Sequence, residues 1–267
     1  LCKLLMENVK LPGVELILTP EKEYRFVFIL RGEGLSENLT DTDPQAVGKK
    51  AHICEATSPD AEATAALVRS FVEQGNQILK DQSPANSFVL RGFAEKPKWP
   101  TFGEVWGVKP VAIAMYPMYR GVSKVVGMDV MPPAQSMEEE IDMLEQQWDS
   151  HDFFFVHMKK TDSYGEDGNF DGKVHIIEEV DALVPRIMAL DPDVVIITGD
   201  HSTPAKLKSH SWHPVPVLLY AKDCRPDGIE TFGERACVRG SLGPRFDATD
   251  LMPFALSHAG RLEKFGA

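Results

Sequence analysis

A run of β-branched residues from Val194 to Thr198 constrains the fold of this chain more than any other segment. Gly199 ends the run, which is typical of a buried parallel strand. Asp200 and His201 follow directly, where ligands usually bind at the edge of an α/β sheet. An adjacent carboxylate and imidazole offer oxygen and nitrogen ligands to a divalent metal. For this dipeptide alone, the alternative of a solvated Asp and a helix-capping turn stays open.

Strands and helices alternate along most of the chain. Besides the run at 194–198, we expect strands at 14–19, 24–30, 87–90, 111–116, 153–158 and 215–220. We expect helices at 1–9, from Ser58 to Leu79, at 119–126, from Ser136 to Trp148, at 171–190 and at 251–259. This alternation predicts an α/β fold, with a mostly parallel sheet that carries helices on both faces. A polar break at 81–86 suggests two domains, 1–84 and 85–267.

Composition limits the partners of the chain. A net charge of -12 argues against nucleic acid or an anionic membrane as the main partner. The four cysteines have no metal-type spacing and do not resemble a disulfide framework, which favours a reducing compartment such as the cytoplasm. No apolar run approaches the roughly 20 residues of a membrane span.

Acidic and imidazole side chains gather just outside three of the expected strands. Asp162 and Glu166 follow the strand at 153–158, and His213 precedes the strand at 215–220. Together with Asp200 and His201, they would give three carboxylates and two imidazoles if the topology brings the three segments to one edge. Such mixed sets suit Mn²⁺ or Zn²⁺ in two-metal phosphoryl chemistry. Each residue also has an ordinary explanation, such as a loop acid, a solvated face or an imidazole packed beside Trp212.

Several motifs together resemble one family. The main ones are Lys160–Asp162, the Asp-Gly-x-Phe-x-x-Lys run at 167–173, Gly199–Pro204 and His210–Pro216. Others are Arg31–Leu35, Thr40–Pro44, Tyr116–Gly121 and Asp250–Pro253. In order and spacing they resemble the archaeal-type cofactor-independent (2,3-bisphosphoglycerate-independent) phosphoglycerate mutases of the alkaline phosphatase superfamily. The resemblance covers essentially the whole chain.

The resemblance implies a cytoplasmic, metal-dependent isomerase of glycolysis and gluconeogenesis that interconverts 3-phosphoglycerate and 2-phosphoglycerate through a phosphoserine. It would use two divalent ions, Mn²⁺ first, with Mg²⁺ or Zn²⁺ as alternatives, and would not require 2,3-bisphosphoglycerate. One metal site would comprise Asp162, Glu166 and His213. The other would comprise Asp200 and His201 with an N-terminal Asp and the nucleophilic Ser. The position of Glu166 is a His in much of the superfamily, and a carboxylate there favours harder cations.

The family's nucleophile and its Asp-Gly-x-Gly segment have no counterpart in this sequence, and Ser202 is not a plausible substitute. We therefore expect an N-terminally truncated mutase whose chain alone lacks the phosphoserine step. Residues 1–84 would form the inserted substrate-binding domain, and 85–267 the C-terminal half of the metal-binding core. The missing strands would leave unpaired strand edges, which favours a homo-oligomer or an unstable chain.

Arginines are the candidates for substrate binding. Arg25 and Arg31 are six residues apart, which places both on one face of a strand, and Arg91 and Arg120 are further candidates. A guanidinium suits the phosphate and carboxylate of a phosphoglycerate, although each arginine is as readily explained as a surface cation. Two other functions stay open. One is a related phosphatase or phosphonate-processing enzyme, and the other, for this chain alone, is a non-catalytic metal-binding module.

Overall fold

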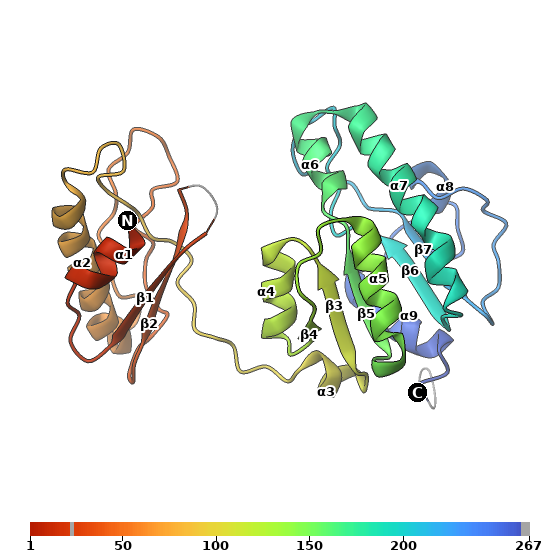
Figure 1. Cartoon of the computed structure of the whole chain (residues 1–267), viewed down its shortest axis with the longest axis horizontal. Coiled ribbons are helices and arrows are strands. Elements are labelled where there is room, and N and C mark those ends of the chain that lie inside the picture. Colours follow the sequence, from red (N-terminus) through yellow and green to blue (C-terminus); the bar gives the residue numbers. More distant parts are fainter. Residues whose placement is uncertain (22–23, 263–267) are drawn as a thin grey trace. The chain divides into compact units, whose positions relative to one another are not determined.

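The computed structural model describes residues 1–21 and 24–262, and it divides the chain into two compact units, Leu1–Pro97 and Lys98–Ala267 (Figure 1). The boundary that we predicted between residues 84 and 85 therefore lies inside the first unit. Residues after the polar break still belong to that unit, because the Leu90 backbone N–H donates to Oγ1 of Thr42 at 2.6 Å. The Phe88 ring also packs on Phe71, with ring centroids 5.0 Å apart. The polar break is thus a turn within the first unit.

The first unit packs two helices against a two-stranded sheet. Its elements are α1 (Cys2–Asn8), β1 (Glu15–Pro20), β2 (Phe26–Arg31), a 3-10 turn (Pro59–Ala61) and α2 (Glu62–Leu79). β1 and β2 are antiparallel, and side chains alternate along β2 between a half-buried and an exposed face. The half-buried Phe28 packs on Phe71 of α2, with ring centroids 4.6 Å apart. The strand predicted at 87–90 is not formed, since that segment bonds to the loop around Thr42 instead of joining the sheet.

The second unit holds the remaining elements of the described chain. Its helices are α3 (Phe102–Trp106), α4 (Pro117–Val125), α5 (Met137–Gln147), α6 (Lys160–Asp167), α7 (Phe170–Ala189), α8 (Glu234–Cys237) and α9 (Leu251–His258). Its strands are β3 (Pro110–Ala114), β4 (Asp129–Val130), β5 (Phe153–His157), β6 (Val194–Thr198) and β7 (Val217–Ala221). Two 3-10 turns, Trp148–Ser150 and Ala248–Asp250, complete it. In the described residues no helix has both the length and the apolar character needed to cross a membrane.

A three-stranded parallel sheet, in the order β4-β3-β5, carries helices on both faces, as predicted. Successive side chains of a strand point to opposite faces. Phe154 of β5 therefore joins the core with Ile141 of α5 and Ile176 of α7. On the other face, Phe153 contacts Phe102 of α3 and Phe155 contacts Tyr119 of α4. Burial of each large side chain in this core contributes about 1.5–3 kcal/mol.

The prediction that β6 is a parallel strand is wrong. β6 pairs with β7 in antiparallel register, in a two-stranded sheet separate from β4-β3-β5. Its residues from Val194 to Ile197 are half-buried rather than fully buried. An unbroken apolar run specifies burial, but it does not specify the direction of the partner strand. The end of β6 still carries Asp200 and His201 toward α6, as the side-chain contacts below show.

Candidate metal centre

Asp162 and Glu166 lie on one face of α6. This helix is separated from β5 by two residues and ends at Gly168, which adopts a left-handed conformation with φ 73°. Residues four apart are neighbours on a helix surface, so the two carboxylates face the same way. Asp162, in the first turn, is largely buried, whereas Glu166 is more exposed. The sequence did not predict this helix, because its residues are mostly polar and lack an apolar stripe.

A second segment, from His201 to Thr203, packs closely against α6. The Thr203 hydroxyl donates to Oδ1 of Asp162 at 2.6 Å and lies 3.0 Å from Nδ1 of His201. The close approach requires a glycine at position 165, because a Cβ there would lie 2.3 Å from the carbonyl oxygen of Thr203. The Thr203 hydroxyl therefore holds the carboxylate of α6 and the imidazole after β6 in one arrangement.

A third segment brings His210 to the same place. An isolated β-bridge pairs Ser202 with Ser211, and the Ser211 N–H donates to the Ser202 carbonyl at 2.9 Å. This bridge sets the His210 ring against the His201 ring, with ring centroids 3.9 Å apart. Nε2 of His210 lies 3.5 Å from Oδ1 of Asp162 and 3.6 Å from Oε1 of Glu166.

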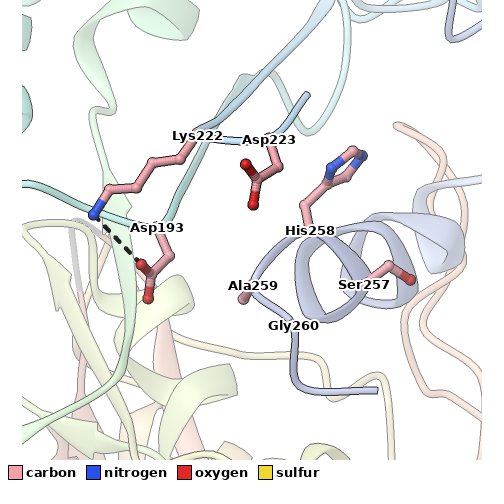
Figure 2. Close-up of a pocket in the computed structure, with 7 residues that line it drawn as sticks. All are labelled: Asp193, Lys222, Asp223, Ser257, His258, Ala259 and Gly260. Atoms are coloured by element: carbon pink, nitrogen blue, oxygen red, sulfur yellow. Dashed lines mark ion pairs between the residues drawn. The ribbon is translucent and has the colours of Figure 1, made fainter. Parts of the chain in front are cut away.

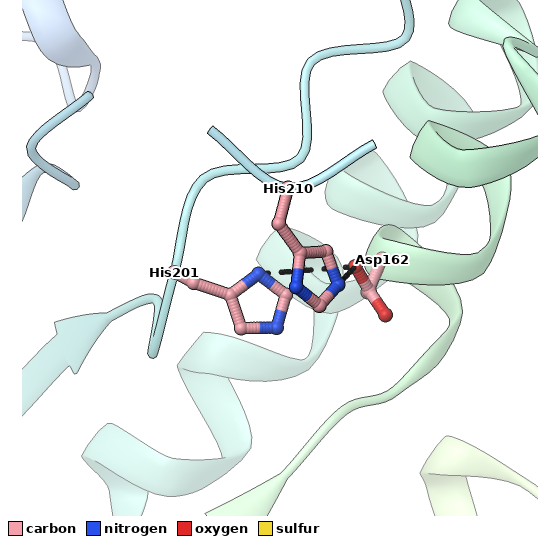
Figure 3. A group of neighbouring side chains, drawn as sticks. All are labelled: Asp162, His201 and His210. Carbon is pink, nitrogen blue, oxygen red and sulfur yellow. Dashed lines mark ion pairs between the residues drawn. The ribbon is translucent and has the colours of Figure 1, made fainter. Parts of the chain in front are cut away.

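Asp162, His201 and His210 form the one cluster of three or more potential metal ligands among residues 1–21 and 24–262 (Figure 3). One donor atom from each lies within 4.8 Å of the others. Figure 3 shows the two imidazoles side by side, with the carboxylate of Asp162 next to them. One carboxylate oxygen and two imidazole nitrogens are a donor set that suits Zn²⁺ or Mn²⁺, so the residues fit a divalent metal.

His213, which we predicted as a ligand, is not in this cluster. Its Nδ1 lies 2.8 Å from the Ser211 hydroxyl, and its ring stacks on Trp212. His210 takes its place beside Asp162. Both histidines stand shortly before β7, so proximity to the strand did not distinguish them. The backbone bridge at Ser211 decides which imidazole faces α6.

Asp200 accepts a hydrogen bond from Tyr119, which in turn stacks on His157. The Tyr119 hydroxyl, from α4, donates to Oδ2 of Asp200, and Nε2 of His201 lies 3.4 Å from the same oxygen. Tyr119 stacks on His157, with ring centroids 3.6 Å apart. Burial, and next the charge of Lys159, lower the pKa of His157 to about 4. His157 is therefore neutral near pH 7, and it adds no positive charge to the centre.

The Asp162 carboxylate is ionised in this setting. Burial acts to raise its pKa, but hydrogen bonds from Lys159 and Thr203 and the charge of Lys159 outweigh that effect. Its pKa is therefore held below the ordinary value. An ionised, largely buried carboxylate beside two imidazoles is ready to accept a cation.

The four predicted substrate arginines have other partners. Arg31 pairs with Glu15 at 2.9 Å, Arg25 with Glu21 at 3.3 Å, and Arg91 with Asp43 at 3.9 Å. All three guanidinium groups are largely exposed, and exposed pairs of this kind are weak enough for an anionic ligand to replace. Arg120 differs, because it donates to the backbone carbonyls of Ala114 and Met131. Its guanidinium fixes the start of α4 against the segment after β4.

A surface pocket elsewhere in the second unit does not compete as a metal centre. It lies where residues before β6 and after β7 meet the end of α9, and Asp193, Lys222 and His258 line it (Figure 2). Asp193 precedes β6 whereas Asp200 follows it, so the pocket lies at the opposite end of that strand. Lys222 already pairs with Asp191 at 2.9 Å and with Asp193 at 3.7 Å.

Comparison with known proteins shows to which family the chain belongs. The model of the metalloenzyme superfamily matches residues 5–258. The chain belongs to the metalloenzyme superfamily. Divalent-metal binding is the property that this superfamily name describes, and the cluster of Asp162, His201 and His210 is the place in the described structure that fits it.

Within the metalloenzyme superfamily, two relatives illustrate what the chain is similar to. A protein of Thermosipho africanus is 48% identical over 266 residues, which cover 99% of this chain and 66% of that protein. A protein of Thermus thermophilus is 48% identical over 261 residues, which cover 97% of this chain and 64% of that protein. Both are named "Probable 2,3-bisphosphoglycerate-independent phosphoglycerate mutase". The chain spans about two thirds of the length of these relatives.

Two solved structures of similar fold support the α/β architecture. The PH0037 protein of Pyrococcus horikoshii matches with a TM-score of 0.68 and 30% identity, over 78% of this chain and 60% of that one. The cofactor-independent phosphoglycerate mutase of Thermoplasma acidophilum matches with a TM-score of 0.73 and 23% identity, over 97% of this chain and 70% of that one. At that identity, the second match bears on the fold alone.

Proposed function

We propose that this chain supplies the metal-binding and substrate-binding parts of a 2,3-bisphosphoglycerate-independent phosphoglycerate mutase. The observation that carries the proposal is the convergence of Asp162, His201 and His210 from three separate segments onto one point. The names of the 48% identical relatives supply the substrate class. The reaction interconverts 3-phosphoglycerate and 2-phosphoglycerate, in the cytoplasm and as part of glycolysis and gluconeogenesis.

Two divalent ions, Mn²⁺ by preference, are part of the proposal. Asp162, Glu166 and His210 would hold one, because Nε2 of His210 lies within 3.6 Å of an oxygen of each carboxylate. His201 lies between the two sites, because its Nδ1 faces Asp162 and its Nε2 lies 3.4 Å from Oδ2 of Asp200. Asp200 and His201 would hold the other ion, with Tyr119 orienting Asp200. When bound, divalent ions of this kind neutralise charge on a transferring phosphoryl group.

The remaining roles fall to residues that bind and orient. Arg25, Arg31 and Arg91 are exposed and would exchange their surface ion pairs for the carboxylate or phosphate of the substrate. Thr203 would hold the side chains of Asp162 and His201 in position through its hydroxyl. Arg120 is left out, because backbone carbonyls of the second unit engage it.

The nucleophilic serine of the proposed reaction would come from sequence outside these 267 residues. The sequence holds no counterpart of the family's serine motif, and the relatives extend beyond the part that this chain spans. In the proposed reaction, this chain therefore binds metal and phosphoglycerate, and a further segment accepts the phosphoryl group.

An activity assay tests the proposal. The chain is joined to the part of the Thermosipho africanus relative that it does not span and is then loaded with Mn²⁺. We expect interconversion of the two phosphoglycerates without added 2,3-bisphosphoglycerate, and loss of the activity with EDTA. Hydrolysis of p-nitrophenyl phosphate without any mutase activity would contradict the proposal and favour a phosphatase.

A further inference from the structure

Lys159 makes a contact that the proposed metal centre does not explain. Its ammonium ion pairs with Oδ2 of Asp162. It also lies 5.0 Å from the ring centroid of Tyr116, which follows β3. Both partners are largely shielded, since the Lys159 side chain is 24% exposed and that of Asp162 is 13% exposed. The ammonium is thus held at the centre rather than in open solvent.

This ion pair conflicts with metal binding at Asp162. Oδ1 of the carboxylate already accepts from Thr203 and faces His210 and His201, while Oδ2 is taken by the Lys159 ammonium. A divalent ion needs a lone pair of the same carboxylate. Two cations compete for one anion, and like charges a few ångströms apart repel strongly in a shielded site.

Release from Asp162 would leave Lys159 beside the centre. The residue stands at the N-terminal end of α6, three positions before Asp162, so its backbone is fixed there. The face of Tyr116 keeps the ammonium near by a cation–π contact. A free ammonium next to a bound cation attracts an anion, and lysine binds phosphate oxygens as a point charge.

The neighbouring lysines are placed differently. Lys160 is exposed, although it is the next residue. Lys173, on α7, donates to the carbonyl of Thr203 at 2.7 Å and so holds the backbone of that segment. Of these three lysines, Lys159 is therefore the one whose ammonium pairs with a member of the metal cluster.

We propose that Lys159 exchanges the carboxylate of Asp162 for a phosphoryl oxygen of the substrate when a divalent ion occupies the centre. This inference rests on the proposed function and adds a phosphate-binding residue to it. Lys159 then has two opposite effects, since it weakens metal binding and strengthens phosphate binding. A merely structural ion pair would also weaken metal binding, but its loss would leave phosphate binding unchanged.

Two titrations of the full chain test the exchange. Isothermal titration calorimetry measures first the affinity for Mn²⁺ and then the affinity of the Mn²⁺-saturated chain for inorganic phosphate. The variants are Lys159→Met and the matched control Lys160→Met, which removes the same charge one residue away. Lys159→Arg keeps the charge, and circular dichroism with thermal unfolding checks that each variant folds.

We expect Lys159→Met to bind Mn²⁺ about tenfold more tightly, because the competing cation is gone. Its affinity for phosphate should be at least about tenfold weaker, because a charge-assisted contact is lost. Lys160→Met should match the wild-type chain in both titrations. Lys159→Arg should stay near the wild-type affinity for Mn²⁺ and keep part of the phosphate affinity.

Unchanged or weaker Mn²⁺ binding by Lys159→Met would overturn the inference about Lys159 but would not contradict the proposed metal centre. Unchanged phosphate affinity in that variant, or no phosphate binding by the wild-type chain, would overturn it as well. A wild-type chain that binds no Mn²⁺ would instead refute the proposed function from which the inference starts.

Discussion

Nε2 of His210 lies 3.5 Å from Oδ1 of Asp162, although the two residues belong to segments far apart in the chain. The contact depends on two backbone features. One is the bridge between Ser202 and Ser211, and the other is the close approach of Gly165 to Thr203. The candidate metal centre is thus a product of backbone packing between α6 and the loops around β6 and β7.

Replacing Gly165 by alanine should disrupt the centre without removing any ligand. The new Cβ would lie 2.3 Å from the Thr203 carbonyl oxygen, so α6 must shift away from Thr203. We expect a loss of about 1–3 kcal/mol in the free energy of unfolding, together with weaker Mn²⁺ binding. Urea unfolding and calorimetry measure the two effects.

Gly121→Ala is the matched control, because nothing lies within 4 Å of a Cβ at that position of α4. It should leave Mn²⁺ binding unchanged and stabilise the chain by up to about 1 kcal/mol, since alanine is the better helix former. Equal effects of the two substitutions would show that the contact with Thr203 is unimportant.

Glu140, on the buried side of α5, should make the chain less stable as the pH rises. Its side chain is fully buried, and burial outweighs the one backbone interaction, with Met115, that favours the ionised carboxylate. Burial raises the pKa of Glu140 to about 7. The unfolded state loses its proton from about pH 4.5, so stability falls between that pH and about 7.

Glu140→Gln removes this ionisation. We expect it to stabilise the chain by about 2 kcal/mol at pH 8 and to have little effect at pH 5, measured by urea unfolding. The exposed Glu178 of α7 supplies the control substitution, Glu178→Gln. A stabilisation by Glu140→Gln that is the same at both pH values would contradict the role of ionisation.

His157 should have the opposite pH dependence. Its Nδ1 is buried without a hydrogen-bond partner in the described structure, and its pKa is lowered to about 4 by burial, with a further contribution from Lys159. The unfolded state binds a proton as the pH falls below about 6.5, so stability is lost between 6.5 and 4.

His157→Phe keeps a ring that can stack on Tyr119 and has no titrating group. The wild-type chain should lose up to about 3 kcal/mol more than this variant between pH 7 and pH 4. Urea unfolding at several pH values measures the difference. Parallel curves for the two proteins would rule out His157 as the source of the acid sensitivity.

The sequence predicted the elements with strong apolar patterns and missed those defined by contacts. The stripes that specify α5 and α7, and the β-branched run of β6, are local signals that the structure confirms. The direction in which β6 pairs is not local, and it was predicted wrongly. The polar helix α6 had only Gly168 as a signal, since a glycine commonly ends a helix in the left-handed conformation.

The candidate site shows the same limit. Asp162, Glu166, Asp200 and His201 could be named from their positions after β5 and β6, and the structure brings them together. Whether His210 or His213 lies beside Asp162 depends on the bridge at Ser211, which no sequence pattern predicts. The domain boundary was placed too early because contacts of Phe88 and Leu90, rather than polar composition, decide it.

Titration of two histidine variants with Mn²⁺ shows which imidazole belongs to the proposed metal centre. His210→Ala removes an imidazole that lies beside Asp162 and Glu166, whereas His213→Ala removes one that contacts Ser211 and Trp212. We predict that His210→Ala weakens Mn²⁺ binding by at least about tenfold and that His213→Ala changes it by less than about twofold. Weaker binding in His213→Ala together with unchanged binding in His210→Ala would show that His213, and not His210, binds the metal.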